Sequence, residues 1–441
     1  MSLRPLVTAL AVCSAAAPAL AATLRVPQDH ATIGAAVAAA QPGDTVLVSA
    51  GTYTEAVTID GIDDLTLRGK GDVTIDATGS AIGIRIQNCA RTRLSGLRLV
   101  GPTTGVFLDQ VEATRIERCE VASTSSAGIL IVAAADVSIS RSAVHDTGGD
   151  GISIVGGTSS LRTQLSRVDV RDVGGNAIYS LGQGDVVSRC VLEDCGVSGA
   201  ALQGDDATLD RVRVARTFRP GIQLFAARGV ASRCVVEDPR ESGIQTFGAD
   251  SPIVRCRVLR AGSVGIRTYG VGSPVQRCRV EGSAATGIQV FEDDSPIERC
   301  SVSAAGQAGI QSFGDRADVL NCRVDGAADH GIDLYSDASA AEGCRVQDAQ
   351  TIGILADGDA NAVTRNVVLR PGADGIVLTG TNARVESNKV KDAGGSGIVA
   401  TTGSHTLDRN TARGSAGLDA DDQVPGENTW TRNRFGTDNI P

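Results

Sequence analysis

The amino-acid sequence predicts an all-β fold, a parallel β-solenoid built from stacked coils of about 22 residues. The first observation is a short sequence that recurs at this period: residues 221–225 read Gly-Ile-Gln-Leu-Phe, and residues 243–247 read Gly-Ile-Gln-Thr-Phe. The second is composition, since 53 glycines and only 3% aromatic residues suit tight corners around a core of small and aliphatic side chains. The third is that a 22-residue unit of short strands cannot bury its own apolar face, whereas stacked units can.

The chain begins with a predicted secretory signal peptide, residues 1–22. Arg4 precedes a short apolar run, and Ala-Leu-Ala at residues 19–21 fits cleavage at small residues. The run is too short to span a membrane, and no later segment is a transmembrane candidate. We therefore expect an exported protein, secreted or periplasmic, in an oxidising compartment. The net charge of −10 makes nucleic acid a poor partner, and the oligomeric state stays open.

Residues 23–60 are predicted to hold one short helix and the first coil. The helix covers residues 32–40, where Thr32 is the candidate N-cap and Pro-Gly at residues 42–43 ends it. From residue 44 to residue 59 apolar and polar residues alternate, which indicates strands.

Residues 61–415 are predicted to form the solenoid itself. A small residue followed by an apolar one marks each coil, and from Ala177 to Gly397 there are ten successive steps of 22 residues. The step from Gly151 to Ala177 is four residues longer, so we expect a small inserted loop at residues 156–160. Neighbouring coils should lie about 4.8 Å apart, so that residues 22 apart form columns along the rod.

Several local motifs resemble a known family. These are Pro-Gly-Asp-Thr-Val at residues 42–46, Gly-Thr-Tyr-Thr-Glu at residues 51–55, Gly-Lys-Gly at residues 69–71, and the repeated Gly-Ile starts with Arg-Cys or Arg-Asn corners. On these motifs the chain resembles the secreted right-handed parallel β-helix repeat proteins of the pectin-lyase-like superfamily. The resemblance covers nearly all of the mature chain and implies a right-handed parallel β-helix whose N-terminal end is capped by the short helix. It leaves the chemistry open, because the superfamily's established catalytic signatures are absent from this sequence.

The last segment, residues 416–441, is predicted to be a C-terminal cap. An open solenoid end exposes apolar core and an unpaired strand edge, and Trp430 and Phe435 can cover both. The alternative is that Trp430 contacts a sugar.

Two columns at the corners have structural and functional interpretations. Cysteine recurs every 22 residues and is then replaced by asparagine. This pattern is compatible with a ladder of packed thiols and amides or with disulfides between adjacent coils. It fits a metal site least well. The members are Cys234, Cys256, Cys278, Cys300, Cys322, Cys344, Asn366, Asn388 and Asn410. Arginines flank this column on both sides, and we expect them either to form a track for an acidic polysaccharide or to be neutralised by neighbours such as Glu237 and Glu281.

Two further columns, one polar and one aromatic, form the predicted ligand-binding surface. Strand alternation directs it outward, where rings could stack on pyranose faces and amides could bind hydroxyls. The alternative is a bend that turns the rings into the core. The predicted binding residues are Gln223, Phe225, Gln245, Phe247, Arg267, Tyr269, Gln289, Phe291, Gln311, Phe313 and Tyr335.

Carboxylates follow the aromatic column in register, and they define a candidate calcium site beside it. Calcium needs several oxygen ligands, although aspartate is also common in turns. The candidate ligands are Asp293, Asp315, Asp337 and Asp359. Calcium is the one cofactor that the pattern suggests.

The candidate catalytic residues are His330 and Asp333, which share one coil with Tyr335 and could perform acid–base chemistry. His145 and Asp146 with Asp150 form an alternative centre beside the inserted loop.

Three functions remain open from sequence alone. The first is an exported β-helix protein that binds, and could also process, an acidic polysaccharide along one outer face. The second is a structural or adhesive cell-surface rod without catalysis. The third is a polysaccharide lyase or epimerase with an unfamiliar site. The fold does not decide among them, because function resides in sites built on folds.

Overall fold

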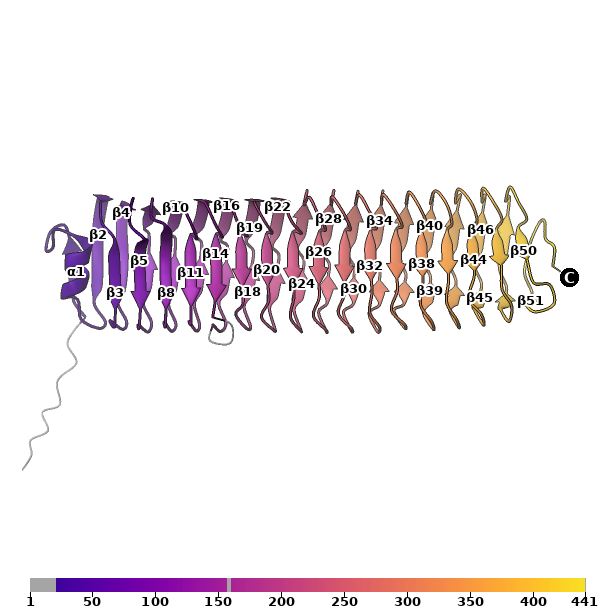
Figure 1. Cartoon of the computed structure of the whole chain (residues 1–441), viewed down its shortest axis with the longest axis horizontal. Coiled ribbons are helices and arrows are strands. Elements are labelled where there is room, and N and C mark those ends of the chain that lie inside the picture. Colours follow the sequence, from indigo (N-terminus) through magenta and orange to yellow (C-terminus); the bar gives the residue numbers. More distant parts are fainter. Residues whose placement is uncertain (1–20, 157–159, 441) are drawn as a thin grey trace, which may run out of the picture.

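The computed structural model describes residues 21–156 and 160–440. The chain winds as stacked coils into a long straight rod, with the helix at one end and the C-terminus at the other (Figure 1). The architecture is all-β, and the predicted parallel solenoid is confirmed. All but two residues of the predicted signal peptide, residues 1–20, lie outside the described residues, so export stays a prediction.

The predicted N-terminal helix is confirmed as α1, Ile33–Ala39. The Thr32 side chain caps it by accepting a hydrogen bond from the Ala35 amide at 3.1 Å. Both carboxylate oxygens of Glu55 accept bonds from the amides of the first turn, at 2.8 Å each. Ile33, Ala36 and Val37 are buried against the first strands, β1 Thr23–Val26, β2 Thr45–Tyr53 and β3 Val57–Asp60, so α1 closes this end of the core.

Each regular coil contributes three short strands, two to sheet A and one to sheet B. In one coil these are β12 Ser138–Ser140 and β13 Ala143–Thr147 in sheet A, and β14 Ile152–Val155 in sheet B. Each pairs in parallel with its counterpart one coil on, β15 Gln164–Ser166, β16 Asp169–Val173 and β17 Ile178–Ser180. These partners are 26 residues apart because this step includes the inserted loop, whereas later partners such as Ile244 and Ile266 are 22 apart, so the register equals the sequence repeat and places equivalent positions above one another.

Sheet A begins at β1, β2 and β4 Thr66–Asp76. It continues as two columns, from β6 Arg93–Ser95 and β7 Arg98–Val100 to β48 Thr406–Asp408, β49 Thr411–Arg413 and β51 Thr429–Thr431. Sheet B carries the candidate site. After β3 its strands are β5 Ile82–Gln87, β8 Thr104–Asp109, β11 Ile129–Val132, β14, β17, β20 Ala200–Leu202, β23 Ile222–Leu224, β26 Ile244–Thr246, β29 Ile266–Thr268, β32 Ile288–Val290, β35 Ile310–Ser312, β38 Ile332–Leu334, β41 Ile354–Ala356, β44 Ile376–Leu378, β47 Ile398–Ala400 and β50 Ala420–Asp422.

The core is one continuous apolar column inside the coils. In the sheet B strands from β23 to β47 the first residue is an isoleucine with 0% exposure, and the third residue is also buried. Thr246 and Thr268 hold this third position with hydroxyls that have no hydrogen-bond partner. The second residue of each strand consequently points outward, as the alternation predicts.

The corner between the two strands of sheet A has an unexpected backbone. The arginine before the cysteine column adopts the left-handed conformation, for example φ 53° at Arg233 and φ 55° at Arg277. The equivalent residues two and three coils beyond Arg277 are Asn321 and Gly343, with φ 54° and φ 65°. This conformation turns the chain so that the next residue enters the core.

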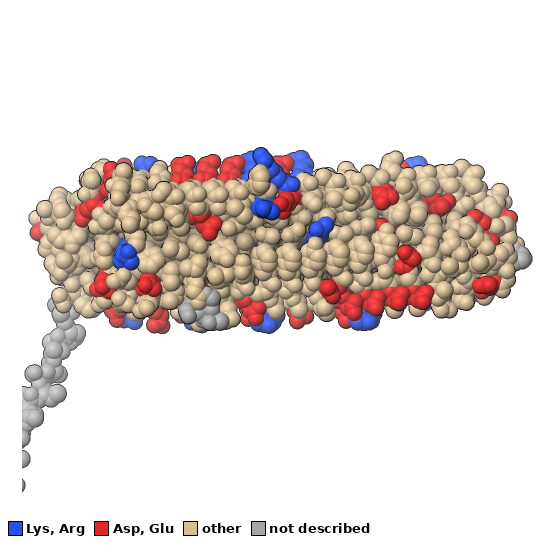
Figure 2. Space-filling model, in the orientation of Figure 1, with Lys and Arg blue, Asp and Glu red and all other residues tan. Residues whose placement is uncertain are grey.

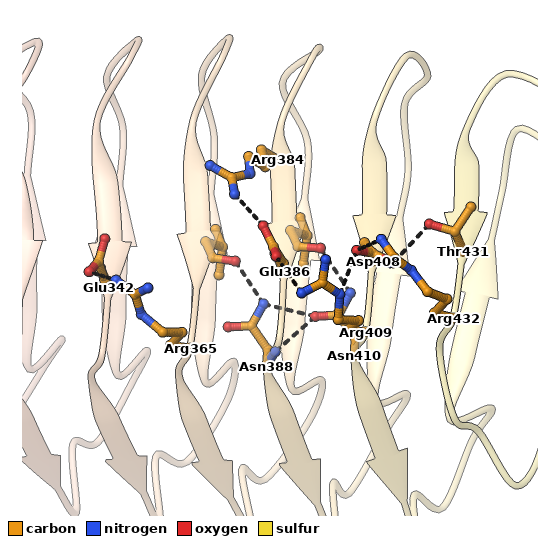
Figure 3. Close-up of polar contacts among 12 residues, drawn as sticks. Glu342, Arg365, Arg384, Glu386, Asn388, Asp408, Arg409, Asn410, Thr431 and Arg432 are labelled. Carbon is orange, nitrogen blue, oxygen red and sulfur yellow. Dashed lines mark hydrogen bonds and ion pairs between the residues drawn. The ribbon is translucent and has the colours of Figure 1, made fainter.

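The described cysteines are buried free thiols, and the predicted ladder is the arrangement observed. The amide of Cys300 donates to the sulfur of Cys322 at 3.4 Å, and the amide of Cys344 donates to Asn366 Oδ1 at 2.8 Å. Further along, the Asn388 side-chain amide donates to Asn410 Oδ1 at 3.0 Å (Figure 3). Thiol and amide oxygen thus accept the same backbone bond, which explains why asparagine can follow cysteine in one column.

The inserted loop lies between β14 and β15, and its residues 157–159 are outside the described part of the chain. At the C-terminal end Trp430 and Phe435 pack against the core with their rings edge to face, 5.9 Å between centroids. Trp430 Nε1 donates to Asp422 Oδ2 at 2.9 Å. The predicted aromatic cap is therefore confirmed.

Candidate functional site

The outer surface of sheet B is a long face with few charges. In the view that shows its strands frontally, most of the surface is uncharged, and acidic and basic residues gather along its upper and lower edges (Figures 1 and 2). The predicted Gln and aromatic columns lie on this face, at the second strand position and two residues further on.

The six aromatic side chains point outward, so the outward prediction is confirmed and the alternative of a ring stack in the core is wrong. Phe225 and Phe247 are 37% exposed and Phe313 is 36% exposed. Successive rings stack with centroids 4.8–5.1 Å apart and interplanar angles of 4–13°. The rings thus form one unbroken stack across six coils.

This stack corrects the expected mode of sugar contact. Parallel rings at the spacing of the coils cover each other's faces, so the four inner rings expose only their edges. A pyranose cannot lie flat on those inner rings. The column is a rigid apolar support for the adjacent polar column, and the polar column carries the available hydrogen-bonding groups.

The polar column is a ladder of amides with a direction. Side-chain nitrogens donate to the oxygen one coil further toward the C-terminus, at 3.4, 2.9, 3.0 and 3.2 Å. The pairs are Gln223 to Gln245, Arg267 to Gln289, Gln289 to Gln311, and Gln311 to Asp333. The ladder ends at a carboxylate, which can only accept.

Arg267 replaces glutamine in the middle of this ladder. Its Nε donates to Gln289, its Nη1 donates to the Tyr269 hydroxyl at 3.2 Å, and the guanidinium lies 5.9 Å from the centroids of the Tyr269 and Phe291 rings. Within the described residues it has no carboxylate partner within 4.0 Å. The side chain is therefore held in place while part of its hydrogen-bonding capacity stays free.

The structure brings the predicted catalytic residues together. His330, in the turn before β38, contacts Asp333 Oδ1 through Nδ1 at 2.7 Å, and its Nε2 lies 3.5 Å from Asp329 Oδ1. Asp333 is 0% exposed although its strand position faces outward, because His330 and Gln311 bind its two oxygens. A histidine ring oriented by a buried carboxylate is a feature of acid–base sites.

Electrostatics distinguish this cluster from the rest of sheet B. The hydrogen bond to Asp333 raises the pKa of His330 above its ordinary value, although burial opposes the shift. Burial, followed by the charges of Asp333 and Asp329, raises the pKa of Tyr335 to about 12. The cluster thus favours the protonated form of His330 more than water does, and it favours the neutral hydroxyl of Tyr335.

The alternative centre does not assemble as predicted. His145 lies on sheet A, where its two ring nitrogens contact Asp146 at 2.8 Å and Glu120 at 3.2 Å. Asp150 instead accepts bonds from the backbone and side chain of Asn176. The three predicted residues therefore do not share one cluster of contacts.

The aspartate column serves the backbone. One carboxylate oxygen of each aspartate accepts the amide of the residue one coil on, at 2.7–3.0 Å, and Arg316 lies 3.7 Å from the first member. The members are Asp293, Asp315, Asp337 and Asp359. Among residues 21–156 and 160–440, no three His, Cys, Asp or Glu side chains converge as a metal site. The geometry therefore does not support the calcium prediction at this column.

The arginine columns of sheet A are neutralised in part, as one interpretation predicts. Arg213 pairs with Glu237 at 2.8 Å, and Arg257 and Arg279 share Glu281. Toward the C-terminus Arg432 pairs with Asp408 and Arg365 with Glu342 (Figure 3). A groove of about 920 Å³ near the N-terminal end is lined by several of these arginines, and its Arg98 and Arg141 are paired with glutamates.

Sequence reasoning missed Phe218. It is the most exposed large hydrophobic residue of the described chain, at 52%, and it lines a cavity at the corner where the chain leaves sheet A. The only sequence signal is that an aromatic residue stands where the two preceding coils have glycine.

Comparison with known proteins establishes the family. Residues 49–164, 128–276 and 264–412 match the family described as the right-handed β-helix region, so the chain belongs to the right-handed β-helix repeat proteins. No curated protein matches the sequence. No helix in the described part of the chain is long and apolar enough to cross a membrane.

Solved structures with a similar fold include carbohydrate-active enzymes. The A-module of the Azotobacter vinelandii mannuronan C-5 epimerase AlgE4 is 15% identical, with a TM-score of 0.43, covering 65% of this chain and 87% of that one. The catalytic domain of a GH87 α-1,3-glucanase in complex with nigerose is 11% identical, with a TM-score of 0.42, covering 62% and 66%. An alginate lyase from Paenibacillus sp. is 16% identical, with a TM-score of 0.34, covering 68% and 97%. At these identities the likeness is one of fold.

Proposed function

We propose that this protein is exported and binds an acidic polysaccharide lengthwise along the outer face of sheet B. The observation that carries the proposal is Arg267, an outward guanidinium without a carboxylate partner in the described residues, flanked on the ladder by the uncharged amides of Gln245 and Gln289. A guanidinium binds a carboxylate through parallel hydrogen bonds, and weak hydration makes it suited to such a partly buried surface.

The shape of the face favours an extended polymer over a small molecule. A polar and an aromatic side chain repeat at every coil from β23 to β35, with Arg267 in place of glutamine on β29, and the ladder continues to Asp333 on β38. Five steps of about 4.8 Å give a platform about 24 Å long. The amides that are already bonded to each other keep a fixed orientation, so a ligand meets a pre-organised row of donors and acceptors.

Replacing Arg267 with glutamine tests this proposal, because glutamine is the residue that the neighbouring coils carry at the same position. Loss of a charge-assisted interaction worth about 1.5–3 kcal/mol should weaken binding to uronate-bearing glycans roughly 10- to 100-fold. Salt dependence of binding should decrease as well.

The matched control is Arg255→Gln, because Arg255 is an exposed arginine at the corner of sheet A and has no ion pair among the described residues. Binding measured by calorimetry should be unchanged in that variant. Equal affinity of wild type, Arg267→Gln and Arg255→Gln would contradict the proposal, and no binding on a glycan array would favour the structural rod.

A second candidate function, a polysaccharide lyase or epimerase, is favoured by the His330–Asp333 pair. Both reactions move a proton at a sugar carbon next to a carboxylate, and a histidine held by a buried carboxylate beside a tyrosine hydroxyl can supply such transfers. Asp333 lies three coils from Arg267 on the same ladder, so one bound chain can reach both.

The assay follows the absorbance of unsaturated uronates, with proton exchange into the sugar measured by NMR for epimerisation. Alginate, pectate and glycosaminoglycans are the substrates. His330→Gln and Asp333→Asn should abolish turnover while binding persists. Absence of both signals with wild type would exclude this candidate and leave the binding proposal standing.

A further inference from the structure

The ring of Phe218 differs from the aromatic stack because it stands alone. It directly follows β22 Arg213–Thr217 and precedes β23, so it lies in the turn that leads into sheet B. Gln223 and Phe225, the first members of the two columns, belong to the same coil. Phe218 therefore lies at the corner where the chain leaves sheet A for sheet B, in the coil that carries the first member of the amide ladder.

One face of this ring is covered and the other is open. The guanidinium carbon of Arg240, one coil further on, lies 4.9 Å from the ring centroid. The opposite face is directed toward the preceding coil, where the equivalent residue is Gly196. A Cβ on Gly196 would lie 2.2 Å from the carbonyl oxygen of Gly174, so the coil geometry admits no side chain there.

The glycine before that one enlarges the opening. A Cβ on Gly174 would also lie 2.2 Å from a backbone oxygen, that of Gly148, so three successive coils have no side chain beneath the ring. The cavity at this place has a volume of about 580 Å³, and its walls include Phe218, Arg240, Gly196 and Asp194. This volume falls within the range of about 300–1,000 Å³ that is usual for small-molecule sites.

Polar groups converge on the same cavity. Arg216 binds both oxygens of Asp194 at 2.7 Å, and Asp238 lies on the C-terminal side, where Arg260 binds both of its oxygens. Carboxylates bound on one side retain acceptor capacity on the other. Arg240 has no ion pair among the residues that the structure describes, so its donors remain free beside the ring.

We propose that this cavity is a subsite for one pyranose residue, which stacks its C–H face on the open face of Phe218 and binds the surrounding carboxylates and Arg240 through its hydroxyls. The proposal rests on the binding function of sheet B and extends it. Phe218 precedes β23 whereas Phe225 follows it, so a glycan on the amide ladder would have to extend from Gln223 across the start of β23 to occupy the cavity in the same coil. The stack supplies only ring edges, so this subsite provides the flat aromatic contact that the rest of the face lacks.

The test compares Phe218→Ala with wild type in calorimetric binding to uronate-bearing oligosaccharides of increasing length. Because the ring is half exposed and packs on one guanidinium, the variant should fold normally, which circular dichroism checks. Loss of the stacking contact should weaken binding about tenfold, and only for chains long enough to span both Arg267 and the cavity. Val271→Ala is the control, because Val271 is a similarly exposed apolar residue, at 47%, outside this cavity.

The outcomes separate the two proposals. If Arg267→Gln weakens binding and Phe218→Ala does not, the subsite is refuted and the ladder stands. If Phe218→Ala and Val271→Ala weaken binding equally, the effect is general apolar contact and the subsite is refuted. If wild type binds no glycan, both proposals fall together.

Discussion

The aromatic stack makes a quantitative prediction about stability. Phe291 lies in its middle, 4.8 Å from the Tyr269 ring and 5.1 Å from the Phe313 ring, whereas Phe225 at the end has one neighbour at 4.9 Å. A stacked pair contributes about 0.5–1.5 kcal/mol beyond area burial, so Phe291→Ala should cost about 1–3 kcal/mol through two lost pairs. Phe225→Ala should cost about half as much.

Hydrogen exchange of backbone amides measures this effect coil by coil, because a solenoid opens locally and need not unfold in one step. Ile288 lies in the coil of Phe291 and Ile310 in the next coil, both in the core. Their backbone amides should exchange faster in Phe291→Ala than in wild type. Exchange in coils near the caps should be unchanged. Equal losses in the two variants, or losses below about 0.5 kcal/mol in both, would refute the view that mutual stacking is what the rings contribute.

Three further predictions concern the columns of the core. Asn388→Ala should lower the free energy of unfolding by about 1–3 kcal/mol in urea titrations, because the buried backbone amide of Asn366 loses its acceptor. Asn388→Cys should retain part of the stability. Burial lowers the pKa of His405 below its ordinary value of 6.5, so folding disfavours protonation of this side chain. The free energy of unfolding should therefore fall as the pH drops below about 6.5. This pH dependence should be absent in His405→Asn. Gly287→Ala should destabilise or prevent folding, judged by circular dichroism, because the new Cβ would lie 2.3 Å from a methyl of Val302.

Most of the fold could be predicted from sequence because the repeat is also the hydrogen-bond register. Every coil bonds to the next, so a period of 22 residues determines which side chains stack, and strand alternation determines which of them face outward. The left-handed arginine corner could not be predicted in this way, because arginine rarely adopts that conformation. Asn321 and Gly343 in the same column were the available signal, since both residue types tolerate it.

The candidate site was predictable in position and less so in detail. The pairing of His330 with Asp333 follows from their closeness around one turn, and the outward ladder follows from alternation. The mutual coverage of the rings depends on side-chain torsions that a column of sequence letters does not specify. The cavity at Phe218 depends on missing side chains in the three preceding coils, so no single sequence motif predicts it.

The functional proposals converge on the positions where the repeat is broken. A uniform glutamine ladder satisfies its own hydrogen bonds, and nothing in folding requires a cation or a buried carboxylate within it. Burying Asp333 at an outward position costs desolvation that His330 and Gln311 offset only in part, since a buried ion pair is weak evidence for stability. Arg267 likewise interrupts the bond from Gln245, because both side chains present donors there. The fold does not need Arg267 or Asp333, yet it holds both rigidly on the outer face of sheet B. A ligand that binds them is the best explanation for their presence.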